Sequence, residues 1–535
     1  MRSWLLVALL VLGCGDDGAP TLDLGRLDGP GDTDAGVDVP PEIRPIVAAA
    51  QANLRRNLAT CVSVAVWRDE RVEHLFGLGT APSREGRPPD EDTLFMIGSD
   101  TKKITAIHFL QQAEASGLDL DAPRRELAPD LSLPEAEPAL AATPHQLLSM
   151  QSGLFDYTGE LGSTTSDGEL ERVTLEDLGA AVYSMNPPGR FWNYSNANFA
   201  LAGWLAERAS AVPWADGVED DLFAPLGMTR SFARRADVDA NHASGVGTRM
   251  GTGTPGQVAL EDTWEDAWVR PAGLVWSTPS DQMRLAAFLV DGDPAVLAGA
   301  RREAITTAQV AASPDTDRTS YGYGLIVDRS LTLPSGFYPD VEVWSHGGNT
   351  LTHTSAWYVL PAQRFALAIL SNGRLDDFAA TAAAAIEALG TLPAPEGGAP
   401  TLPPDDAITD ALAGDYLDGF IVGALELTRS EAGLDVSMPA LDEARVPYVA
   451  ALTPFTPRQW IAQIQGAALP FRFSADDAGE GGYLVTRGFV ARRERGGARA
   501  SLRGLPHLER LAAPILVPRA LRDPPMKLDR ILPLA

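Results

Sequence analysis

The pattern of hydrophobic and polar positions predicts strands at both ends of residues 41–390 and helices between them. Near the start of this region, two apolar runs, 61–67 and 71–76, are joined by a short polar turn. Near its end a second pair of runs, 355–360 and 365–371, is joined in the same way. Because strands joined by short turns pair antiparallel, we expect an α+β domain with helices on an antiparallel sheet, and not a repeated βαβ unit.

Helical spacing of apolar residues predicts the segments that cover this sheet. The expected helices span residues 43–54, 99–116, 196–209 and 375–389. The glycine-rich segment 245–251 lacks the spacing of a dinucleotide-binding loop, and we interpret it as a mobile loop.

A second, smaller domain is expected after a linker. Residues 391–406 contain five prolines and two glycines, which is typical of a linker. Beyond it, short alternating segments separated by turns predict a small all-β domain over 407–535. Residues 487–530 carry eleven Arg or Lys against four Asp or Glu, a charge of +7 in an acidic chain. This stretch could neutralise the acidic main domain by docking on it, which we favour, or contact an anionic polymer of the cell envelope.

Charge and cysteine content narrow the function classes. The net charge of −28 disfavours nucleic acid and anionic membrane surfaces as partners. There are two cysteines, Cys14 and Cys61, so no disulfide framework is expected. Cys61 begins an apolar run, and we interpret it as a small core residue and not as a nucleophile.

The N-terminal residues are expected to direct export. Residues 1–13 contain an apolar run of signal-peptide length, which is too short to span a bilayer. The run ends at Val11-Leu12-Gly13-Cys14, which resembles the lipobox of bacterial lipoproteins. This resemblance implies that Cys14 is lipidated and anchors the protein in a bacterial membrane, facing the periplasm or the exterior. The alternative is an ordinary secretory signal that contains a cysteine. Residues 14–40 are acidic and lack an apolar period, and we expect a disordered tether.

The first candidate for chemistry is a serine followed by a rare lysine. The chain has three lysines against forty arginines, and Ser99 with Lys102 forms its single Ser-x-x-Lys. Residues three apart share one face of a helix, so the amine can reach the hydroxyl. A helix N-terminus favours developing negative charge, and a partly desolvated lysine can accept a proton, which arginine cannot. The competing interpretation is a helix-capping serine with a solvent-facing lysine.

Two further segments could complete such a site. Tyr194-Ser195-Asn196 is the single Tyr-x-Asn of the chain, and a tyrosine beside a lysine can exchange protons with a serine hydroxyl. Otherwise Asn196 is a helix cap. In His346-Gly347-Gly348-Asn349, two glycines let the backbone approach a bound substrate, and an N–H there could complete an oxyanion hole with that of Ser99. Otherwise this segment is a glycine turn with a structural histidine.

Together these motifs resemble the serine β-lactamase and penicillin-binding-protein superfamily, in particular its class C β-lactamase, D,D-carboxypeptidase and esterase branch. Phe95–Lys102 resembles the first motif of that superfamily, Tyr194–Asn196 the second, and His346–Gly348 takes the place of the third. The order and spacing fit over about residues 41–390. Further segments that match are 147–154, 272–278 and 321–324.

The resemblance implies a fold and residue roles. It implies a five-stranded antiparallel sheet flanked by helices, with a helical subdomain, followed by a β-rich accessory domain. Ser99 would be acylated, and Lys102 and Tyr194 would share the general-base and general-acid roles. Asn196 would hold the substrate amide, and the N–H groups of Ser99 and Asn349 would form the oxyanion hole.

The third motif departs from the superfamily pattern. His346 stands where many β-lactamases have lysine, and Gly347 replaces a hydroxyl residue that contacts the β-lactam carboxylate. Weak or no β-lactamase activity is therefore expected, with hydrolysis of an ester or a peptide amide instead.

The sequence thus predicts an envelope serine hydrolase with a small-molecule ester or peptide substrate and no cofactor. No metal-ligand cluster, P-loop or Gly-x-Ser-x-Gly elbow is present in the sequence. Contact with a membrane is expected through the lipid anchor alone, and the oligomeric state stays open. The alternative is a catalytically silent binding or scaffold lipoprotein that kept the fold.

Overall fold

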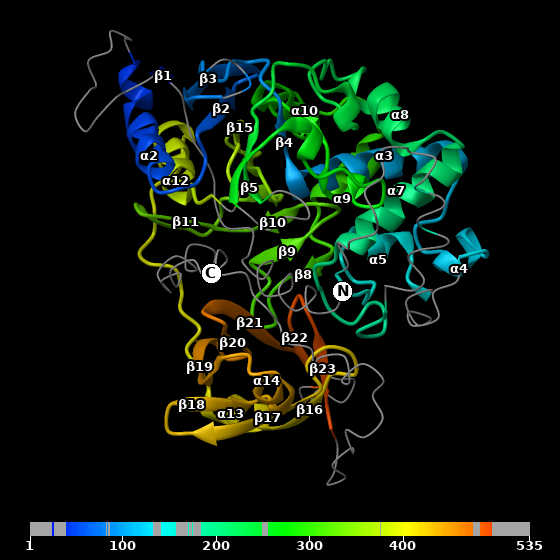
Figure 1. Ribbon diagram of the computed structural model, residues 1–535, viewed down its shortest axis with the longest axis vertical. Coiled ribbons are helices and arrows are strands. Elements are labelled where there is room, and N and C mark those ends of the chain that lie inside the picture. The colour runs from blue at the N-terminus through cyan, green and yellow to red at the C-terminus, as the bar shows by residue number, and fades with distance from the viewer. Residues whose placement is uncertain are drawn as a thin grey trace.

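The protein is described by a computed structural model, which covers residues 39–494 and the short segment Leu24–Gly25. Within 39–494, the description leaves out 82, 84–85, 132–140, 157–182 apart from Leu170 and Thr174, 249–254, 375 and 475–481. Two bodies follow one another along the chain, a larger α+β body and a smaller barrel (Figure 1).

A mixed sheet forms the centre of the larger body. The described residues place nine strands in the order β1-β3-β2-β15-β14-β13-β10-β9-β8. The predicted hairpins are confirmed as β2 (Cys61–Arg68) with β3 (Arg71–Gly79), and β14 (Thr354–Leu360) with β15 (Phe365–Ser371). Strand β15 pairs antiparallel with β2, which joins the two ends of the domain, and β13 (Val343–Asn349) pairs with β14.

The five antiparallel strands β3-β2-β15-β14-β13 correspond to the expected five-stranded sheet, and short strands extend it at both edges. On one side lie β10 (Ile326–Asp328), β9 (Thr319–Tyr321) and β8 (Val310–Ala311). On the other side β1 (Leu24–Gly25) pairs parallel with β3, so these two residues of the expected disordered tether are in a strand. Strands of two or three residues carry too little periodicity to be predicted from sequence.

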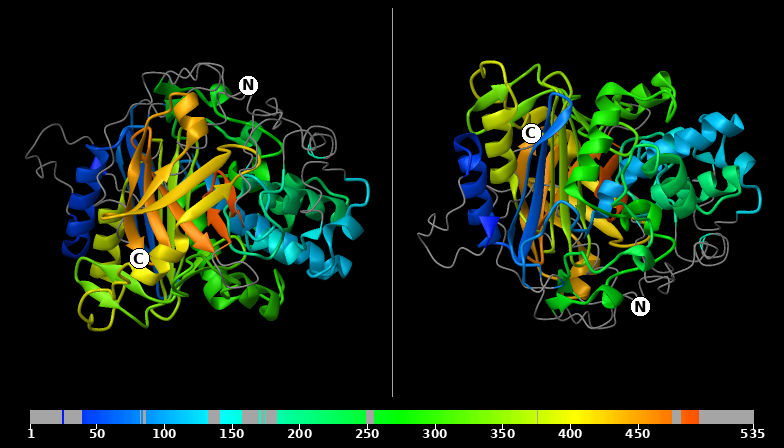
Figure 2. Two further views of the ribbon diagram at one scale, coloured as in Figure 1. Left: turned by 90° about the horizontal axis from the view of Figure 1, so that it is seen from below. Right: turned by 90° about the horizontal axis from the view of Figure 1, so that it is seen from above.

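Helices cover both faces of the sheet (Figure 2). One face packs against α2 (Arg44–Leu54) and α12 (Ala379–Leu389), which share a core with the apolar side chains of β2 and β15. On the other face, α10 (Pro279–Asp291) packs on β2 and β15, α3 (Thr101–Ser116) lies in the same larger core, and α7 (Asn196–Ser210) packs on α3. The predicted helices are therefore present, although α12 begins at Ala379 and not at 375.

Smaller elements complete the larger body. Among the described residues, the remaining helical segments are η1 (Pro41–Ile43), η3 (Gly98–Asp100), α4 (Arg124–Leu127), α5 (Pro144–Leu148), α8 (Trp214–Val218), η7 (Glu219–Phe223), η8 (Arg235–Asp237), η9 (Leu260–Asp262), α9 (Arg270–Gly273) and α11 (Gly299–Thr306). Small two-stranded antiparallel sheets are formed by β4 (Phe95–Met96) with β7 (Trp276–Ser277), β5 (Gly245–Thr248) with β6 (Pro255–Val258), and β11 (Leu331–Leu333) with β12 (Gly336–Tyr338). The interpretation of 245–251 as a mobile loop was wrong for its first four residues, because β5 is paired with β6.

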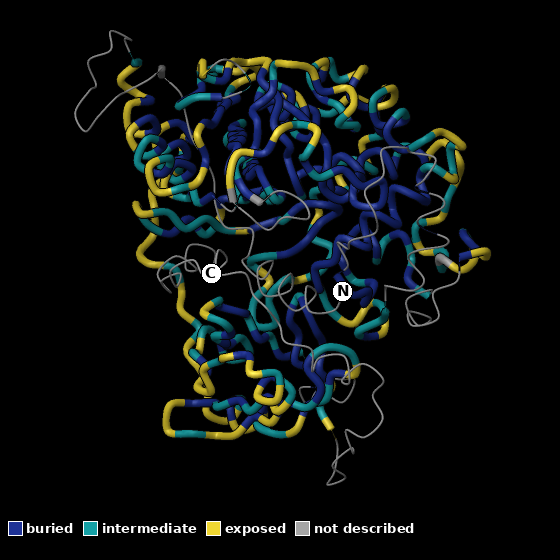
Figure 3. Tube along the Cα trace, in the orientation of Figure 1, coloured by how far each residue is buried: buried dark blue, intermediate teal, exposed yellow. Residues whose placement is uncertain are grey.

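The smaller body is a closed barrel, which confirms the predicted all-β domain. Its described strands are β16 (Gly414–Leu417), β17 (Ala424–Ser430), β18 (Gly433–Ser437), β19 (Tyr448–Thr456), β20 (Gln459–Ile464), β21 (Ala467–Ser474), β22 (Tyr483–Val485) and β23 (Val490–Arg493). Pairing of β16 with β23 closes the barrel, and α13 (Asp406–Leu412) and α14 (Pro439–Glu443) accompany it. Each body has a buried interior of its own (Figure 3).

Several predicted features lie outside the described residues. They are the signal sequence with Cys14, most of the tether, and the basic stretch beyond residue 494. Among the residues that are described, none of the helices has both the length and the apolar character needed to cross a bilayer.

Candidate active site

The Ser-x-x-Lys motif lies where a turn of 3-10 helix meets α3. Ser99 is in η3 and is partly exposed, in contrast to the buried residues on both sides of it. Lys102 is in the first turn of α3, is fully buried, and places Nζ 2.9 Å from Ser99 Oγ. The interpretation of Lys102 as a solvent-facing lysine is therefore wrong. Ser99 precedes α3 and does not begin it as predicted, because the 3-10 turn comes first.

Two acceptors hold the amine of Lys102 toward the serine. Lys102 Nζ donates to Asn196 Oδ1 at 2.6 Å and to the carbonyl oxygen of Ala272 at 2.7 Å. Both partners can only accept, so they fix two of the amine hydrogens. The remaining position of the nitrogen faces Ser99 Oγ. There it holds a third hydrogen when the amine is charged, and a lone pair when it is neutral.

Tyr194 brings a second polar atom to the same hydroxyl. Its phenolic oxygen donates to Ser99 Oγ at 2.8 Å. Lys102 Nζ lies 4.8 Å from the centre of the tyrosine ring. Tyr194 sits just before α7, and this helix packs on α3, so the two motifs predicted from sequence meet in space.

Asn196 is held between the lysine and a buried carboxylate. Its Oδ1 accepts from Lys102, while its Nδ2 and backbone N donate to Asp156 Oδ1 at 3.0 and 2.7 Å. The side chain of Asp156 is 2% exposed. Asn196 is thus engaged on both ends of its amide, and it orients Lys102.

The His346 segment lies on β13, beside the turn that carries Ser99. His346 is fully enclosed, and burial lowers its pKa to about 3, with the nearby Lys102 acting in the same direction. Its Nδ1 lies 2.6 Å from the carbonyl oxygen of Gly347, which requires the proton on Nδ1. Nε2 can then accept from the Tyr321 hydroxyl at 3.3 Å. His346 is therefore a neutral imidazole at neutral pH and supplies no cation.

Gly348 of this segment and Gly98 of the nucleophile turn permit a close approach, but of a different kind from the one predicted. A Cβ atom on Gly348 would overlap the carbonyl oxygen of Ile97 and lie 2.5 Å from Ser355 Oγ. A Cβ atom on Gly98 would lie 2.7 Å from Asn349 N. The glycines therefore let β13 pack directly on the backbone that leads into Ser99, which brings Asn349 N beside the nucleophile turn.

We expect Gly348→Ala to lower activity at least about tenfold, because misplacing reacting groups by about 1 Å costs as much or more. The added methyl would push the end of β13 away from Ile97. Gly256→Ala is the control, since a Cβ there meets nothing within 4 Å. Initial rates of hydrolysis by the folded variants measure the loss of activity, and melting temperatures show whether either variant is destabilised. Equal rates for both variants would contradict the proposed role of the close approach.

Three groups at this site were missed by the sequence analysis. The Ala272 carbonyl belongs to a segment that was noted as a match, but a backbone acceptor leaves no mark in the sequence. Asp156 is one of many acidic residues in the chain. Arg487 belongs to the barrel and lies at the start of the basic stretch that was predicted to dock on the main domain. Its contact with Asp156 agrees with that interpretation for this residue.

The fold and this site define the class of protein, a serine hydrolase related to β-lactamases and penicillin-binding proteins. The Beta-lactamase family model matches residues 48–391, and the chain belongs to that family.

Curated relatives match parts of the chain. Penicillin-binding protein 4 of Amycolatopsis lactamdurans is 27% identical over 312 residues, which are 56% of this chain and 77% of that protein. Esterase EstB of Burkholderia gladioli is 34% identical over 195 residues, which are 33% of this chain and 48% of the esterase.

Solved structures extend the likeness in fold. SurE aligns with a TM-score of 0.61 and 22% identity, and the alignment covers 85% of this chain and 99% of SurE. D-amino acid amidase from Ochrobactrum anthropi SV3 aligns with a TM-score of 0.53 and 23% identity, covering 65% of this chain and 98% of the amidase.

Proposed function

We propose that this protein hydrolyses an ester or a peptide amide through an acyl-enzyme on Ser99. The observation that carries the proposal is the convergence of Lys102 Nζ and the Tyr194 hydroxyl, 2.9 and 2.8 Å from Ser99 Oγ. A nucleophile within hydrogen-bond reach of a base that is itself oriented by further groups is the arrangement that nucleophilic catalysis needs.

Lys102 is proposed as the general base and Tyr194 as the general acid. Ser99 Oγ attacks the substrate carbonyl carbon and gives its proton to neutral Lys102. The two hydrogens already on the amine stay hydrogen-bonded to Asn196 Oδ1 and the Ala272 carbonyl oxygen. Tyr194, whose hydroxyl donates in the resting site, gives its proton to the leaving alcohol or amine as the scissile bond breaks. The proton held by Lys102 then restores Tyr194. Water repeats the sequence on the ester of Ser99 and releases the acid.

The carbonyl oxygen is proposed to be held by the backbone N–H groups of Ser99 and Asn349. Developing negative charge on this oxygen is stabilised most by donors that are fixed before the reaction. The packing of Gly348 on Ile97 supports this assignment, because it fixes the end of β13 beside the nucleophile turn.

The proposed substrates are esters or peptide amides, including amides of D-residues, with little or no turnover of β-lactams. A substrate carboxylate is bound most strongly by charged donors. The third motif offers the neutral His346 and the glycine Gly347, which has no hydroxyl. An esterase and a D-amino acid amidase among the similar proteins support this choice. The rival function, a silent scaffold lipoprotein, gives no reason for a fully buried lysine to stay beside a serine.

A labelling experiment tests the proposal. The full chain is incubated with a fluorescent fluorophosphonate and, separately, with a fluorescent penicillin, beside the Ser99→Ala variant as control. We expect the fluorophosphonate to label the parent protein and not the variant, and p-nitrophenyl esters or D-amino acid amides to be hydrolysed by the parent protein alone. Absence of both labels would favour the scaffold function, and a lasting penicillin adduct would favour a D,D-peptidase over an esterase.

A further inference from the structure

A turn of the barrel reaches the active site of the larger body. Thr486–Phe489 connect β22 to β23, and this turn is closed by Thr486 Oγ1, which accepts from the backbone N atoms of Gly488 and Phe489. The carbonyl oxygen of Thr486 accepts from Asn193 Nδ2 at 3.1 Å, one residue before Tyr194. The turn is therefore fixed internally and fixed to the segment that carries the catalytic tyrosine.

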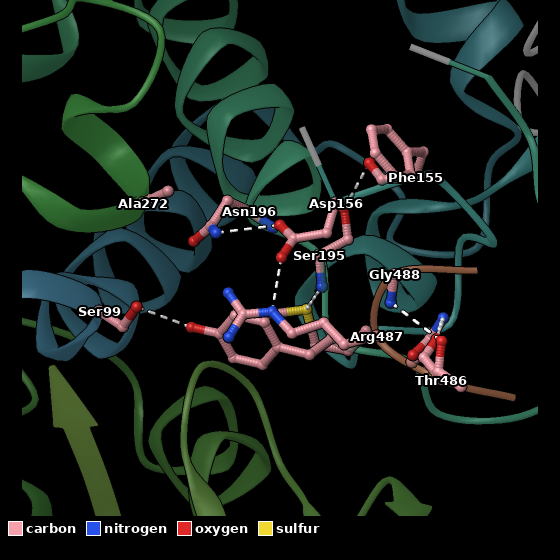
Figure 4. Close-up of polar contacts among 12 residues, drawn as sticks. Ser99, Phe155, Asp156, Ser195, Asn196, Ala272, Thr486, Arg487 and Gly488 are labelled. Atoms are coloured by element: carbon pink, nitrogen blue, oxygen red, sulfur yellow. Dashed lines mark hydrogen bonds and ion pairs between the residues drawn. The ribbon is translucent and has the colours of Figure 1, made fainter. Parts of the chain in front are cut away.

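Arg487, at the tip of this turn, contacts two parts of the site (Figure 4). Its Nε donates to Asp156 Oδ2 at 2.6 Å. Its guanidinium carbon lies 4.4 Å from the centre of the Tyr194 ring, within the range of a cation–π contact. The side chain is 22% exposed, and the carboxylate that it meets is 2% exposed, so water screens this pair only in part.

Asp156 transmits the contact to the catalytic lysine. One carboxylate oxygen binds Arg487, and the other accepts from both nitrogens of Asn196, whose Oδ1 accepts from Lys102 Nζ. A continuous series of hydrogen bonds and ion pairs thus runs from the barrel to the amine beside Ser99. Residues that hydrogen-bond to the catalytic side chains in this way determine how accurately the reacting groups are positioned.

We propose that Arg487 is a positioning residue, through which the barrel completes the active site. It orients the Tyr194 ring directly and orients Lys102 through Asp156 and Asn196. This inference depends on the proposed function, because it assigns a role in the acylation of Ser99. It gives residues 407–494 a function in catalysis and not solely in attachment or stability.

The barrel is held by other contacts that do not involve the site. Arg458 pairs with Asp315 at 3.0 Å and donates its backbone N to the same carboxylate at 2.7 Å. Phe420 stacks on Tyr183 with ring centres 3.9 Å apart. Loss of Arg487 is therefore expected to leave the barrel docked, and Arg458 provides a matched control at the same interface.

The test measures the rate of Ser99 acylation and steady-state hydrolysis in Arg487→Met, Arg487→Lys and the control Arg458→Met. We expect Arg487→Met to lower kcat and the acylation rate about 10- to 100-fold, with KM changed less than about threefold. Arg487→Lys keeps the positive charge and is expected to recover the rate to within about fivefold of the parent protein. Arg458→Met is expected to keep the parent rate, with a melting temperature lowered by at most a few degrees.

A double-mutant cycle with Asp156→Asn tests the route. If Arg487 acts through Asp156, the losses of Arg487→Met and Asp156→Asn are expected not to multiply in the double variant. Parent-like acylation in Arg487→Met, or an equal loss in Arg458→Met, would overturn the inference. If Arg487→Met does not fold, the same acylation and hydrolysis rates are measured in Arg487→Lys and Asp156→Asn. Parent-like rates in Asp156→Asn would then overturn the inference. Absence of any labelling in the parent protein would refute the proposed function itself, and this inference with it.

Discussion

Replacing Lys102 with methionine is expected to lower the acylation rate of Ser99 about 10²- to 10⁴-fold, the range lost with a general base. Methionine has nearly the length of lysine and fills the buried site without a nitrogen. The change leaves Asn196 Oδ1 and the Ala272 carbonyl without their donor, at a cost of about 1–3 kcal/mol each. We therefore expect a lower melting temperature as well, and stopped-flow measurement of acylation on folded protein separates the two effects.

Lys103 provides the control, because it is the next residue and equally buried. It pairs with Asp100, and its amine lies 4.6 Å from the centre of the Trp357 ring. Burial lowers the pKa of Lys103, and the carboxylate of Asp100 acts against this shift. Removing one partner of a buried pair costs about 3–5 kcal/mol, so Lys103→Met is expected to destabilise more and to slow folded enzyme less. Equal losses of rate per folded molecule would mean that Lys102 matters only for structure.

The nucleophile and base could be predicted because their signal is local. A single Ser-x-x-Lys in a chain of three lysines fixes both residues, and the geometry of one helical turn joins them. The meeting of Tyr194 with Ser99 required the packing of α7 on α3, which composition and periodicity do not determine. It was the order of the motifs, through the resemblance, that placed the tyrosine beside the serine.

The contributions of the backbone and the barrel could not be predicted for physical reasons. The Ala272 carbonyl acts through its position on α9, and any residue type there offers the same oxygen. Arg487 is one of forty arginines and gains its role from a turn between two short strands. Some strands could be predicted and others could not. Strand β15 is buried along its whole length and has a nearly continuous apolar sequence, whereas β16 has four residues and only a weak alternation of apolar and polar positions.

The consequence of the altered third motif could be predicted in part from the sequence. The loss of a cation at His346 was predicted from the resemblance, because many β-lactamases have lysine at this place in the third motif. The structure adds that burial keeps the imidazole neutral, so it does not regain a positive charge in mildly acid conditions. The site therefore has its permanent positive group at Arg487, next to the Tyr194 ring, and not on β13. Lys102, which also lies next to this ring, becomes positive in the proposed mechanism when it takes the proton of Ser99.

Tyr194→Phe is expected to distinguish the general-acid role of Tyr194 from the general-base role of Lys102. Phenylalanine keeps the ring that Lys102 and Arg487 contact and removes only the hydroxyl that reaches Ser99 Oγ. If Tyr194 protonates the leaving group, the loss depends on how much that group needs a proton. We expect kcat/KM for a D-amino acid amide to fall about 10²- to 10⁴-fold, and kcat/KM for a p-nitrophenyl ester to fall far less, because p-nitrophenolate leaves as an anion.

The matched control is Tyr323→Phe, which also removes a buried hydroxyl. That hydroxyl bonds His145 Nδ1 at 2.7 Å, and its loss should lower stability by about 1 kcal/mol. Neither substrate should then be hydrolysed more slowly per folded molecule. Equal losses of kcat/KM on the amide and the ester in Tyr194→Phe would instead indicate that Tyr194 is the base that activates Ser99. Lys102 would then supply a positive charge beside the tyrosine. The same two substrates applied to Lys102→Met should give the opposite pattern, with both rates falling together, because every substrate needs Ser99 to lose its proton.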